Sequence, residues 1–225
     1  MCHRPLGSYF WRNQVRPRKR RRNNRPDRGY SERSGYSSSG TKAKSGYRSH
    51  FLYLGRFAQT AQKDYETLLR AFDRLVMEFQ DCDLTLVGGG EREGEIRSLL
   101  VSLTHARSRT EMVGFCDPKP WLERADALIH PSLAEGMSNT LLEGMAHGVT
   151  RIANDIPPNR EVLGGGEAGI LVPVGDVDSL VQAMRRLATV PGECEQWRPR
   201  GRKRAEEVYR SIGSPISTSN FMRHF

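Results

Sequence analysis

The sequence is short of cysteine and has no long apolar run. Its 225 residues include 4 cysteines, none in a C-x-x-C pair or in a His/Cys cluster at metal-ligand spacing. Such isolated thiols are typical of a reduced, cytoplasmic protein. Runs of about 18 apolar residues, which would span a membrane, are missing, as is the apolar core of about 7–15 residues that marks a secretory signal. We therefore expect a cytoplasmic location, with the inner face of the membrane as the alternative.

The excess of positive charge is confined to the first fifty residues. The whole chain has a formal net charge of +9, from 35 Lys and Arg against 26 Asp and Glu. Residues 1–50 contain 14 of the basic and 2 of the acidic residues, which leaves residues 51–225 with 21 and 24. The main part of the chain is thus mildly acidic, and the total charge says nothing about its ligand.

A basic N-terminal arm differs in composition from the rest of the chain. Residues 1–49 are rich in Arg, Ser, Gly and Asn and show neither helical nor strand periodicity. Their few apolar side chains cannot offset the entropy of ordering. We expect this arm to be disordered, residues 50–213 to form one folded domain, and residues 214–225 to form a flexible tail.

Short apolar segments alternate with amphipathic ones from residue 51 onward. Strands are predicted within 51–55, 83–90, 110–115, 126–132, 150–154 and 168–176, and helices from 64 and at 91–103, 120–125, 139–148, 160–166, 178–190 and about 202–211. The predicted strands have no polar face, which is typical of a parallel sheet covered by helices on both sides. The sequence therefore predicts an α/β, doubly wound Rossmann-like domain, whose ligands bind at the carboxyl ends of the strands.

Two cations follow the first predicted strand. Arg56 comes directly after Gly55, and Lys63 precedes the helix that Asp64 opens. A planar guanidinium and an ammonium beside a helix N-terminus suit a diphosphate. The alternative is that both are ordinary surface cations.

A second candidate lies between a predicted strand and the helix that begins near Ser138. The free amides of Gly136, Met137 and Ser138 at that helix N-terminus suit an anion. Glu135 and Glu143 are too far apart for one acid–base pair, but they can hold hydroxyls at two ends of a ligand whose phosphates lie between them. The alternative is that Ser138 is an N-cap and that Glu143 lies on a solvated face.

Other motifs are less informative. Gly88-Gly89-Gly90 is not a full dinucleotide fingerprint, and it predicts a tight strand-to-helix turn that can allow a ligand to approach closely. His130, at a strand end, is expected to be structural, and the sequence has no G-x-S-x-G elbow.

Four segments of the chain, taken in order, form a family signature. They are FLYLGRF with QKDYETLLRAF, LTLVGGGEREGEIRSL, MVGFCD with PWLERADALIHPSLAEGMSNTLLEGMAHG, and ANDIPPNREVLGGGEAGILVPVGDVDSLVQAM. Together they resemble the donor-binding half of the retaining glycosyltransferases of family 4, the glycosyl transferases group 1 family. The resemblance covers residues 51 to about 190, and its most specific part is the E-x7-E motif of Glu135 and Glu143.

The resemblance implies the C-terminal half of a GT-B fold, and transfer of a sugar from a nucleoside diphosphate sugar with retention of anomeric configuration. It implies Arg56 and Lys63 on the diphosphate, Glu135 as the catalytic residue at the sugar hydroxyls, Glu143 on the ribose and Phe115 near the base. The donor-binding residues at the helix N-terminus would be Gly136, Met137, Ser138 and Asn139. No cofactor and no metal are expected, because cationic side chains and helix dipoles stabilise the leaving diphosphate.

The chain departs from the family at its N-terminal end. The family has an N-terminal acceptor domain of comparable size, and only the basic arm precedes Phe51 here. Three explanations stay open: a truncated or out-of-frame gene product, one subunit of a split enzyme whose acceptor domain is a separate chain, or a functional tail. The acceptor, a glycan or a lipid-linked molecule, is not specified.

Two other functions also stay open. One is nucleotide-sugar binding without catalysis, because half of the cleft is missing. The other is nucleic-acid binding, in which the RKRRR run of the arm neutralises phosphates and the tyrosines of the arm stack on bases.

A second departure concerns a single buried cation. After the Gly148-Val149 pair the family usually has Pro followed by apolar residues, where this chain has Thr150 and Arg151. A buried arginine without a partner is costly. We therefore expect Arg151 to distort its strand or to lie at the edge of the sheet.

Overall fold

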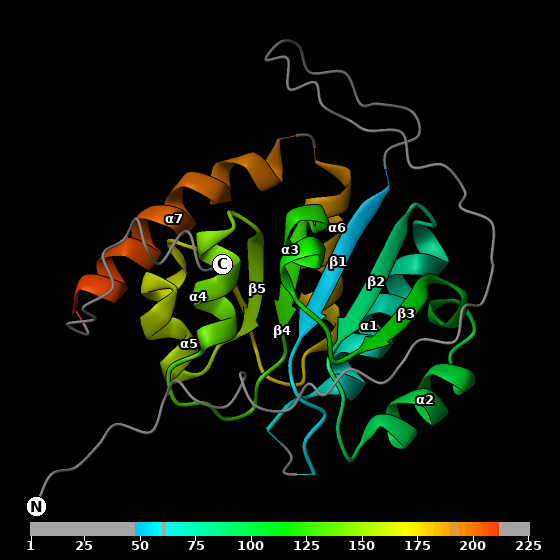
Figure 1. The fold of residues 1–225 in the computed structure, drawn as a ribbon. Helices are drawn as coiled ribbons and strands as arrows, with labels where there is room; N and C mark the ends of the chain where they lie inside the picture. The colour runs from blue at the N-terminus through cyan, green and yellow to red at the C-terminus, as the bar shows by residue number, and fades with distance from the viewer. Residues whose placement is uncertain (1–47, 60–61, 191, 212–225) are drawn as a thin grey trace, which may run out of the picture. The chain divides into compact units, whose positions relative to one another are not determined.

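Six strands form one sheet in the order β3-β2-β1-β4-β5-β6, and every neighbouring pair is parallel (Figure 1). The computed structural model describes residues 48–59, 62–190 and 192–211, so residues 1–47 of the predicted arm and the predicted tail 214–225 lie outside it. The strands are β1 Ser49–Leu54, β2 Cys82–Val87, β3 Thr110–Gly114, β4 Ala127–His130, β5 Thr150–Asn154 and β6 Ile170–Val172. The predicted α/β fold class is confirmed.

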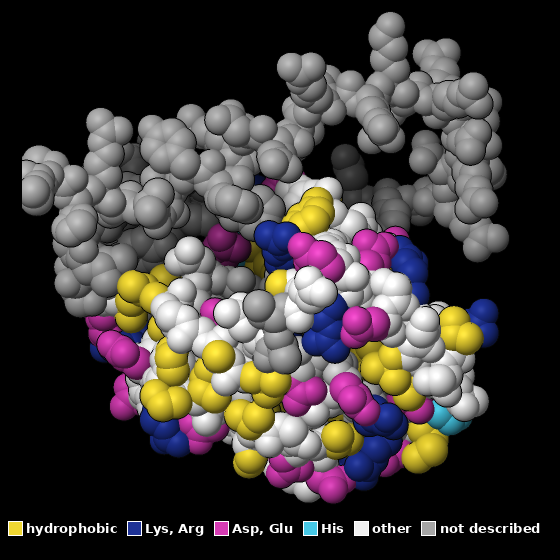
Figure 2. Space-filling model, turned by 90° about the horizontal axis from the view of Figure 1, so that it is seen from below, with side chains coloured by type: hydrophobic (Ala, Val, Ile, Leu, Met, Phe, Trp, Pro, Cys, Tyr) yellow, Lys and Arg dark blue, Asp and Glu magenta, His cyan; other side chains and the backbone are white. Residues whose placement is uncertain are grey.

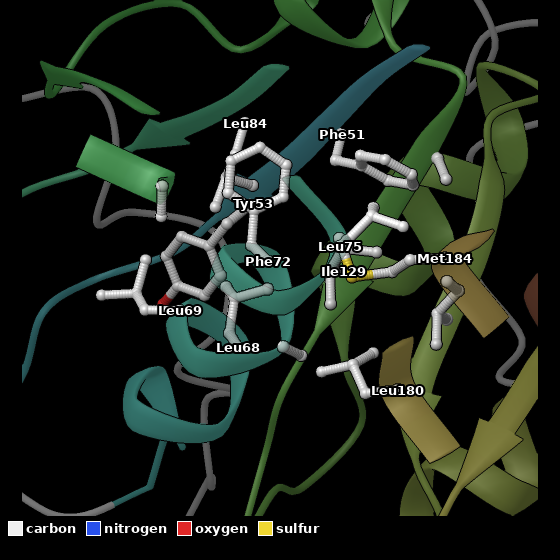
Figure 3. Packing of buried hydrophobic residues seen from close by; sticks show 14 of the residues in the cluster. Phe51, Tyr53, Leu68, Leu69, Phe72, Leu75, Leu84, Ile129, Leu180 and Met184 are labelled. Carbon is white, nitrogen blue, oxygen red and sulfur yellow. The ribbon is translucent and has the colours of Figure 1, made fainter. Parts of the chain in front are cut away.

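Helices cover both faces of this sheet, because successive residues of a strand point to opposite faces. Phe51 and Tyr53 of β1 belong to the core under α1 and α6, whereas Leu52 belongs to the core under α3 (Figures 1 and 3). The helices are α1 Tyr65–Glu78, α2 Glu93–Ser102, α3 Lys119–Arg124, α4 Asn139–Ala146, α5 Pro157–Val162, α6 Val177–Thr189 and α7 Glu193–Ser211, with short 3-10 turns η1 Ala106–Arg109 and η2 Gly164–Gly166.

The helix α1 shows how local sequence sets these elements. Asp64 is its N-cap, and the Asp64 side chain accepts a hydrogen bond of 3.0 Å from the backbone N–H of Thr67. The apolar residues that follow at helical spacing are fully buried against the sheet, as Figure 3 shows for Leu68, Leu69 and Phe72. The predicted start of this helix is confirmed, and it sets the position of Lys63 one residue earlier.

Two predicted boundaries differ from the structure. Ser49, assigned to the arm, is the first residue of β1 and is buried, and Arg48 forms an ion pair of 3.0 Å with Asp83. The last helix begins at Glu193 rather than near residue 202, although Pro199 lies inside it. Its first turns bury Trp197, and such tertiary packing overrides the weak helix propensity of this segment.

Arg151 is fully buried, and the expectation that it would distort its strand or lie at an edge is wrong. β5 lies between β4 and β6 and pairs with both in continuous register. The Arg151 guanidinium donates hydrogen bonds to the backbone carbonyl oxygens of Val149, Ala168 and Trp197, the Nε–Ala168 bond being 2.9 Å long. These oxygens replace water around the cation, and burial lowers the pKa of Arg151 to about 9.

This contact explains the glycine in the middle of α7. A Cβ atom at Gly201 would lie 2.3 Å from Nη1 of Arg151, closer than any real contact allows. The guanidinium therefore needs Gly201 to reach the carbonyl oxygen of Trp197. Arg151 thus joins β5 to α7, two elements that are far apart in the sequence.

We expect Arg151→Met to lower the free energy of unfolding by about 2–4 kcal/mol, because several buried carbonyl oxygens lose a charged donor. Urea unfolding of the wild-type chain and of the variant measures the difference. Arg107→Met, at an exposed arginine of η1, is the matched control and should change stability by less than about 0.5 kcal/mol. Equal small effects in both variants would contradict the structural role of Arg151.

Candidate functional site

The strand order reverses between β1 and β4, and the connections that leave these two strands meet there. Lys63 and Ser132 form an isolated antiparallel bridge. On either side of it, the N–H of Asp64 donates to the carbonyl of Pro131 at 2.7 Å, and the N–H of Leu133 donates to the carbonyl of Gln62 at 2.8 Å. In open parallel sheets, ligands bind at such a reversal, at the carboxyl ends of the strands.

Polar side chains gather around this bridge, and we call Lys63, His130, Ser132, Glu135 and Ser138 the Lys63 cluster. The Lys63 ammonium forms an ion pair with the carboxylate of Glu135 and donates to Oγ of Ser132 at 2.6 Å. Only 15% and 20% of the Lys63 and Glu135 side chains are exposed, and burial lowers the pKa of Lys63 to about 8. The structure therefore joins two of the predicted site residues, from segments that the sequence keeps 72 residues apart.

His130 lies at the centre of the cluster, which the sequence analysis did not anticipate. Its Nε2 is 2.9 Å from Oγ of Ser132, 2.9 Å from Oγ of Ser138 and 3.2 Å from Oε1 of Glu135. The ring is buried, and desolvation, followed by the nearby charge of Lys63, lowers its pKa well below the ordinary value. The adjacent serine in His-Pro-Ser was the only signal in the sequence for this arrangement.

The N-terminus of α4 adjoins the cluster through its cap. Ser138 is the N-cap, as the alternative interpretation of this segment had it, and its Oγ accepts a hydrogen bond of 3.3 Å from the N–H of Leu141. The preceding Gly136 and Met137 are exposed, as is Asn139 in the first turn. The positive end of the α4 dipole is therefore accessible beside Lys63 and Glu135.

Arg56 is not part of the Lys63 cluster. Its guanidinium forms an ion pair of 2.6 Å with Glu91, and about half of each side chain is exposed. Such exposed pairs contribute little stability and are easily exchanged. The structure thus places Arg56 on the same connection as Lys63 but directs it toward the loop that follows β2.

The glycine loop after β2 packs against this chain's own β1–α1 connection. A Cβ atom at Gly88 would lie 1.8 Å from the carbonyl oxygen of Gly55, and φ at Gly88 is +140°. The N–H of Phe57 also donates to the carbonyl of Gly89 at 3.0 Å. The backbone of Gly55 therefore approaches this loop closely, and the approach of a ligand stays a prediction.

Phe115 follows β3 at the same edge of the sheet. Its side chain is 60% exposed, and its ring lies over Gly89, where a Cβ atom would come within 2.9 Å of it. Leu133 and Met137 are further exposed apolar residues at this edge. Figure 2, which is seen from below the view of Figure 1, shows apolar side chains on this face mixed with charges of both signs. This edge of the sheet is therefore partly apolar, and the exposed ring of Phe115 lies over the backbone of Gly89.

Glu143 does not lie on a solvated face. It is partly buried in α4, and its carboxylate forms no hydrogen bond or ion pair within residues 48–59, 62–190 and 192–211. Burial raises its pKa to about 7. The oxygens of this half-buried carboxylate therefore have unused capacity to accept hydrogen bonds.

The described part of the chain contains no group of three or more His, Cys, Asp or Glu side chains that could hold a metal ion. Over the same residues, no helix is both long and apolar enough to cross a bilayer. The cysteines within it, Cys82, Cys116 and Cys194, are free thiols.

Comparisons of sequence identify related proteins. The sequence pattern of the family described as Glycosyl transferases group 1 matches residues 48–189. A phosphatidyl-myo-inositol mannosyltransferase from Mycolicibacterium smegmatis is 34% identical over 134 residues, which are 59% of this chain and 34% of that protein. An MMP alpha-(1->4)-mannosyltransferase from Mycolicibacterium hassiacum is 34% identical over 155 residues, or 68% of this chain and 38% of that protein.

Solved structures share the fold. Sucrose-phosphate synthase from Thermosynechococcus elongatus has a TM-score of 0.65 at 26% identity, covering 79% of this chain and 45% of that one. Anabaena HepE in complex with UDP and glucose has a TM-score of 0.63 at 17% identity, covering 74% and 48%. The predicted match to one half of GT-B glycosyltransferases is confirmed, and this chain spans between about a third and a half of these proteins.

The raised pKa of Glu143 predicts a pH-dependent loss of stability. The unfolded chain releases this proton near the ordinary pKa of 4.5, whereas the folded chain retains it up to about 7. The free energy of unfolding therefore falls as the pH rises from 4.5 to about 7. Above this range the folded chain bears the full cost of burying the charged carboxylate. Glu143→Gln should match the wild-type chain near pH 4 and exceed its stability by roughly 2 kcal/mol at pH 8.

Urea unfolding at the two pH values measures this difference. Glu123→Gln, at an exposed position of α3, is the matched control and should show no pH-dependent gain. A Glu143→Gln variant whose advantage is the same at both pH values would show that the carboxyl is not penalised by burial.

Proposed function

Because the chain belongs to the glycosyl transferases group 1 family, we propose that it binds a nucleoside diphosphate sugar and supplies the donor half of a retaining glycosyltransferase. The observation that supports this most is the Lys63 cluster at the reversal of the sheet, where a cation, a carboxylate and a helix N-terminus meet. Phosphates and sugar hydroxyls are the groups that such a set recognises.

The diphosphate would lie against Lys63 and the N-terminus of α4. The ammonium and the first-turn amides around Gly136, Met137, Ser138 and Asn139 stabilise negative charge that develops on the leaving phosphate. A phosphate on Lys63 competes directly with Glu135 for the ammonium. Donor binding therefore exchanges one ionic partner of Lys63 for another. Arg56 joins the phosphates by leaving its exposed pair with Glu91.

The two glutamates would bind hydroxyls at either side of the phosphates. Glu135, released by Lys63, accepts from the sugar at the reacting centre and keeps its 2.7 Å hydrogen bond from Ser132. Glu143, which lacks a partner among the described residues, accepts from the ribose. Phe115 offers its ring to the base.

Transfer requires an acceptor that this chain does not itself specify. The bond between the anomeric carbon and the phosphate oxygen breaks, and the nucleoside diphosphate leaves with the bonding electron pair. The acceptor hydroxyl oxygen forms the new bond on the same face of the sugar, and its proton passes to the leaving phosphate. This chain spans less than half of its curated relatives, and we propose that the acceptor binds a domain that faces this one. The exposed Leu133 and Met137 beside the cluster are the surface that such a domain would cover.

A panel of nucleotides tests the proposed function. The full chain is heated with UDP, GDP, UDP-glucose or GDP-mannose, and with AMP as a comparison. A nucleotide at 100 times its dissociation constant should add about 2.7 kcal/mol of stability and raise the melting temperature. No shift with any nucleoside diphosphate or its sugar, confirmed by calorimetry, would refute donor binding.

Removing the ammonium should weaken binding of the diphosphate. Lys63→Met is expected to lower the affinity for the nucleoside diphosphate at least about tenfold, or 1.4 kcal/mol, because a charge-assisted contact is lost. Isothermal calorimetry measures it, with Lys203→Met, an exposed lysine of α7, as the matched control. Unchanged affinity in a folded Lys63→Met chain would remove Lys63 from the site.

A further inference from the structure

His130 contacts each of the four other residues of the Lys63 cluster. The members come from three segments: Lys63 from the β1–α1 connection, Ser132 and Glu135 from the β4–α4 connection, and Ser138 from the cap of α4. The His130 Nε2 lies 2.9 Å from the oxygen of each serine, 3.2 Å from Glu135 and 3.5 Å from the ammonium of Lys63. One ring atom of β4 therefore lies within reach of side chains from all of these segments.

The two ring nitrogens of His130 are not equivalent. Nδ1 is buried and has no hydrogen-bond partner in the described structure, whereas Nε2 is surrounded by oxygen atoms. An unpaired buried N–H is rarer in proteins than an unpaired acceptor. The neutral ring is thus expected to carry its proton on Nε2 and to donate. Burial and the charge of Lys63, which lower the pKa of His130, favour this neutral form.

The serine hydroxyls support the same assignment. Oγ of Ser132 accepts from Lys63 at 2.6 Å and donates its single proton to Glu135 at 2.7 Å, so a further contact must be one that it accepts. Oγ of Ser138 accepts from the N–H of Leu141 and keeps a second lone pair, which can accept from Nε2–H. The Nε2–H of His130 therefore faces two oxygens, of which that of Ser132 must accept and that of Ser138 can accept.

We propose that His130 is a positioning residue, whose Nε2–H fixes Ser132 and Ser138 and thereby keeps Glu135 directed at the sugar when a phosphate has taken Lys63. This inference rests on the proposed donor binding. Before the donor binds, Lys63 and Ser132 both contact the Glu135 carboxylate. After a phosphate has taken Lys63, Ser132 is the one of these two partners that remains. His130 therefore matters for contact with the sugar more than for contact with the diphosphate.

Two conservative variants separate this role from simple packing. The side-chain amide of Gln reaches as far as Nε2 of histidine, whereas that of Asn reaches only as far as Nδ1. For each variant, calorimetry measures the affinity for UDP-glucose relative to UDP and for GDP-mannose relative to GDP. His130→Gln should keep this ratio within about twofold of wild type, and His130→Asn should lower it about three- to tenfold, the value of one hydrogen bond.

His147 provides the matched control, because it caps the opposite end of α4. His147→Gln and His147→Asn should leave the ratio unchanged. Urea unfolding sets the conditions under which each variant is folded, so that the ratio compares folded proteins. Equal ratios for His130→Gln and His130→Asn, whether both normal or both low, would overturn the positioning role.

A spectroscopic measurement decides the tautomer without any ligand. The imidazole ¹⁵N signals of the wild-type chain should show His130 neutral with its proton on Nε2 at pH 6.5, where an ordinary imidazole is half protonated, beside the charges of Lys63 and Glu135. A proton on Nδ1, or titration near the ordinary value, would overturn the proposal even if donor binding holds. Conversely, a wild-type chain that binds neither UDP nor GDP refutes the proposed function. The ¹⁵N signals then still show which nitrogen of His130 carries the proton.

Discussion

The backbone bridge between Lys63 and Ser132 is the contact on which the candidate site depends. It joins the connection after β1 to the connection after β4 at the one place where the strand order reverses. Backbone atoms make the bridge and its flanking hydrogen bonds. The approach of Lys63 to Glu135 is therefore already fixed before a ligand binds. A ligand that binds there does not have to bring Lys63 and Glu135 together first, which lowers the entropic cost of binding.

Burial moves two groups beside this bridge, Lys63 and His130, and a third group further along α4, Glu143, toward their neutral forms. It lowers the pKa of Lys63 to about 8 and that of His130 below its ordinary value, and it raises the pKa of Glu143 to about 7. A ligand with both phosphates and hydroxyls would oppose these shifts, since phosphate favours the ammonium and hydroxyl donors favour the carboxylate. Ligand binding and protonation at this site are therefore expected to be linked.

Arg151 shows the opposite way of burying a charge. Its guanidinium is enclosed and receives no carboxylate, but carbonyl oxygens from three positions accept its protons. Lys63 has an ionic partner that a ligand can replace. The partners of Arg151 are backbone carbonyl oxygens that precede β5, precede β6 or lie in α7, and no ligand can displace them. The first arrangement suits binding and the second suits permanent attachment of α7 to the sheet.

Alternating apolar segments and the cap at Asp64 were enough to predict the sheet, most helices and the edge where the candidate site lies. These signals act within a few residues, so the sequence alone determines them. The partner of Arg56, the central place of His130, the early start of α7 and the enclosure of Arg151 were decided only by the tertiary structure. Each depends on atoms from segments far apart in the chain, whose approach no local pattern encodes.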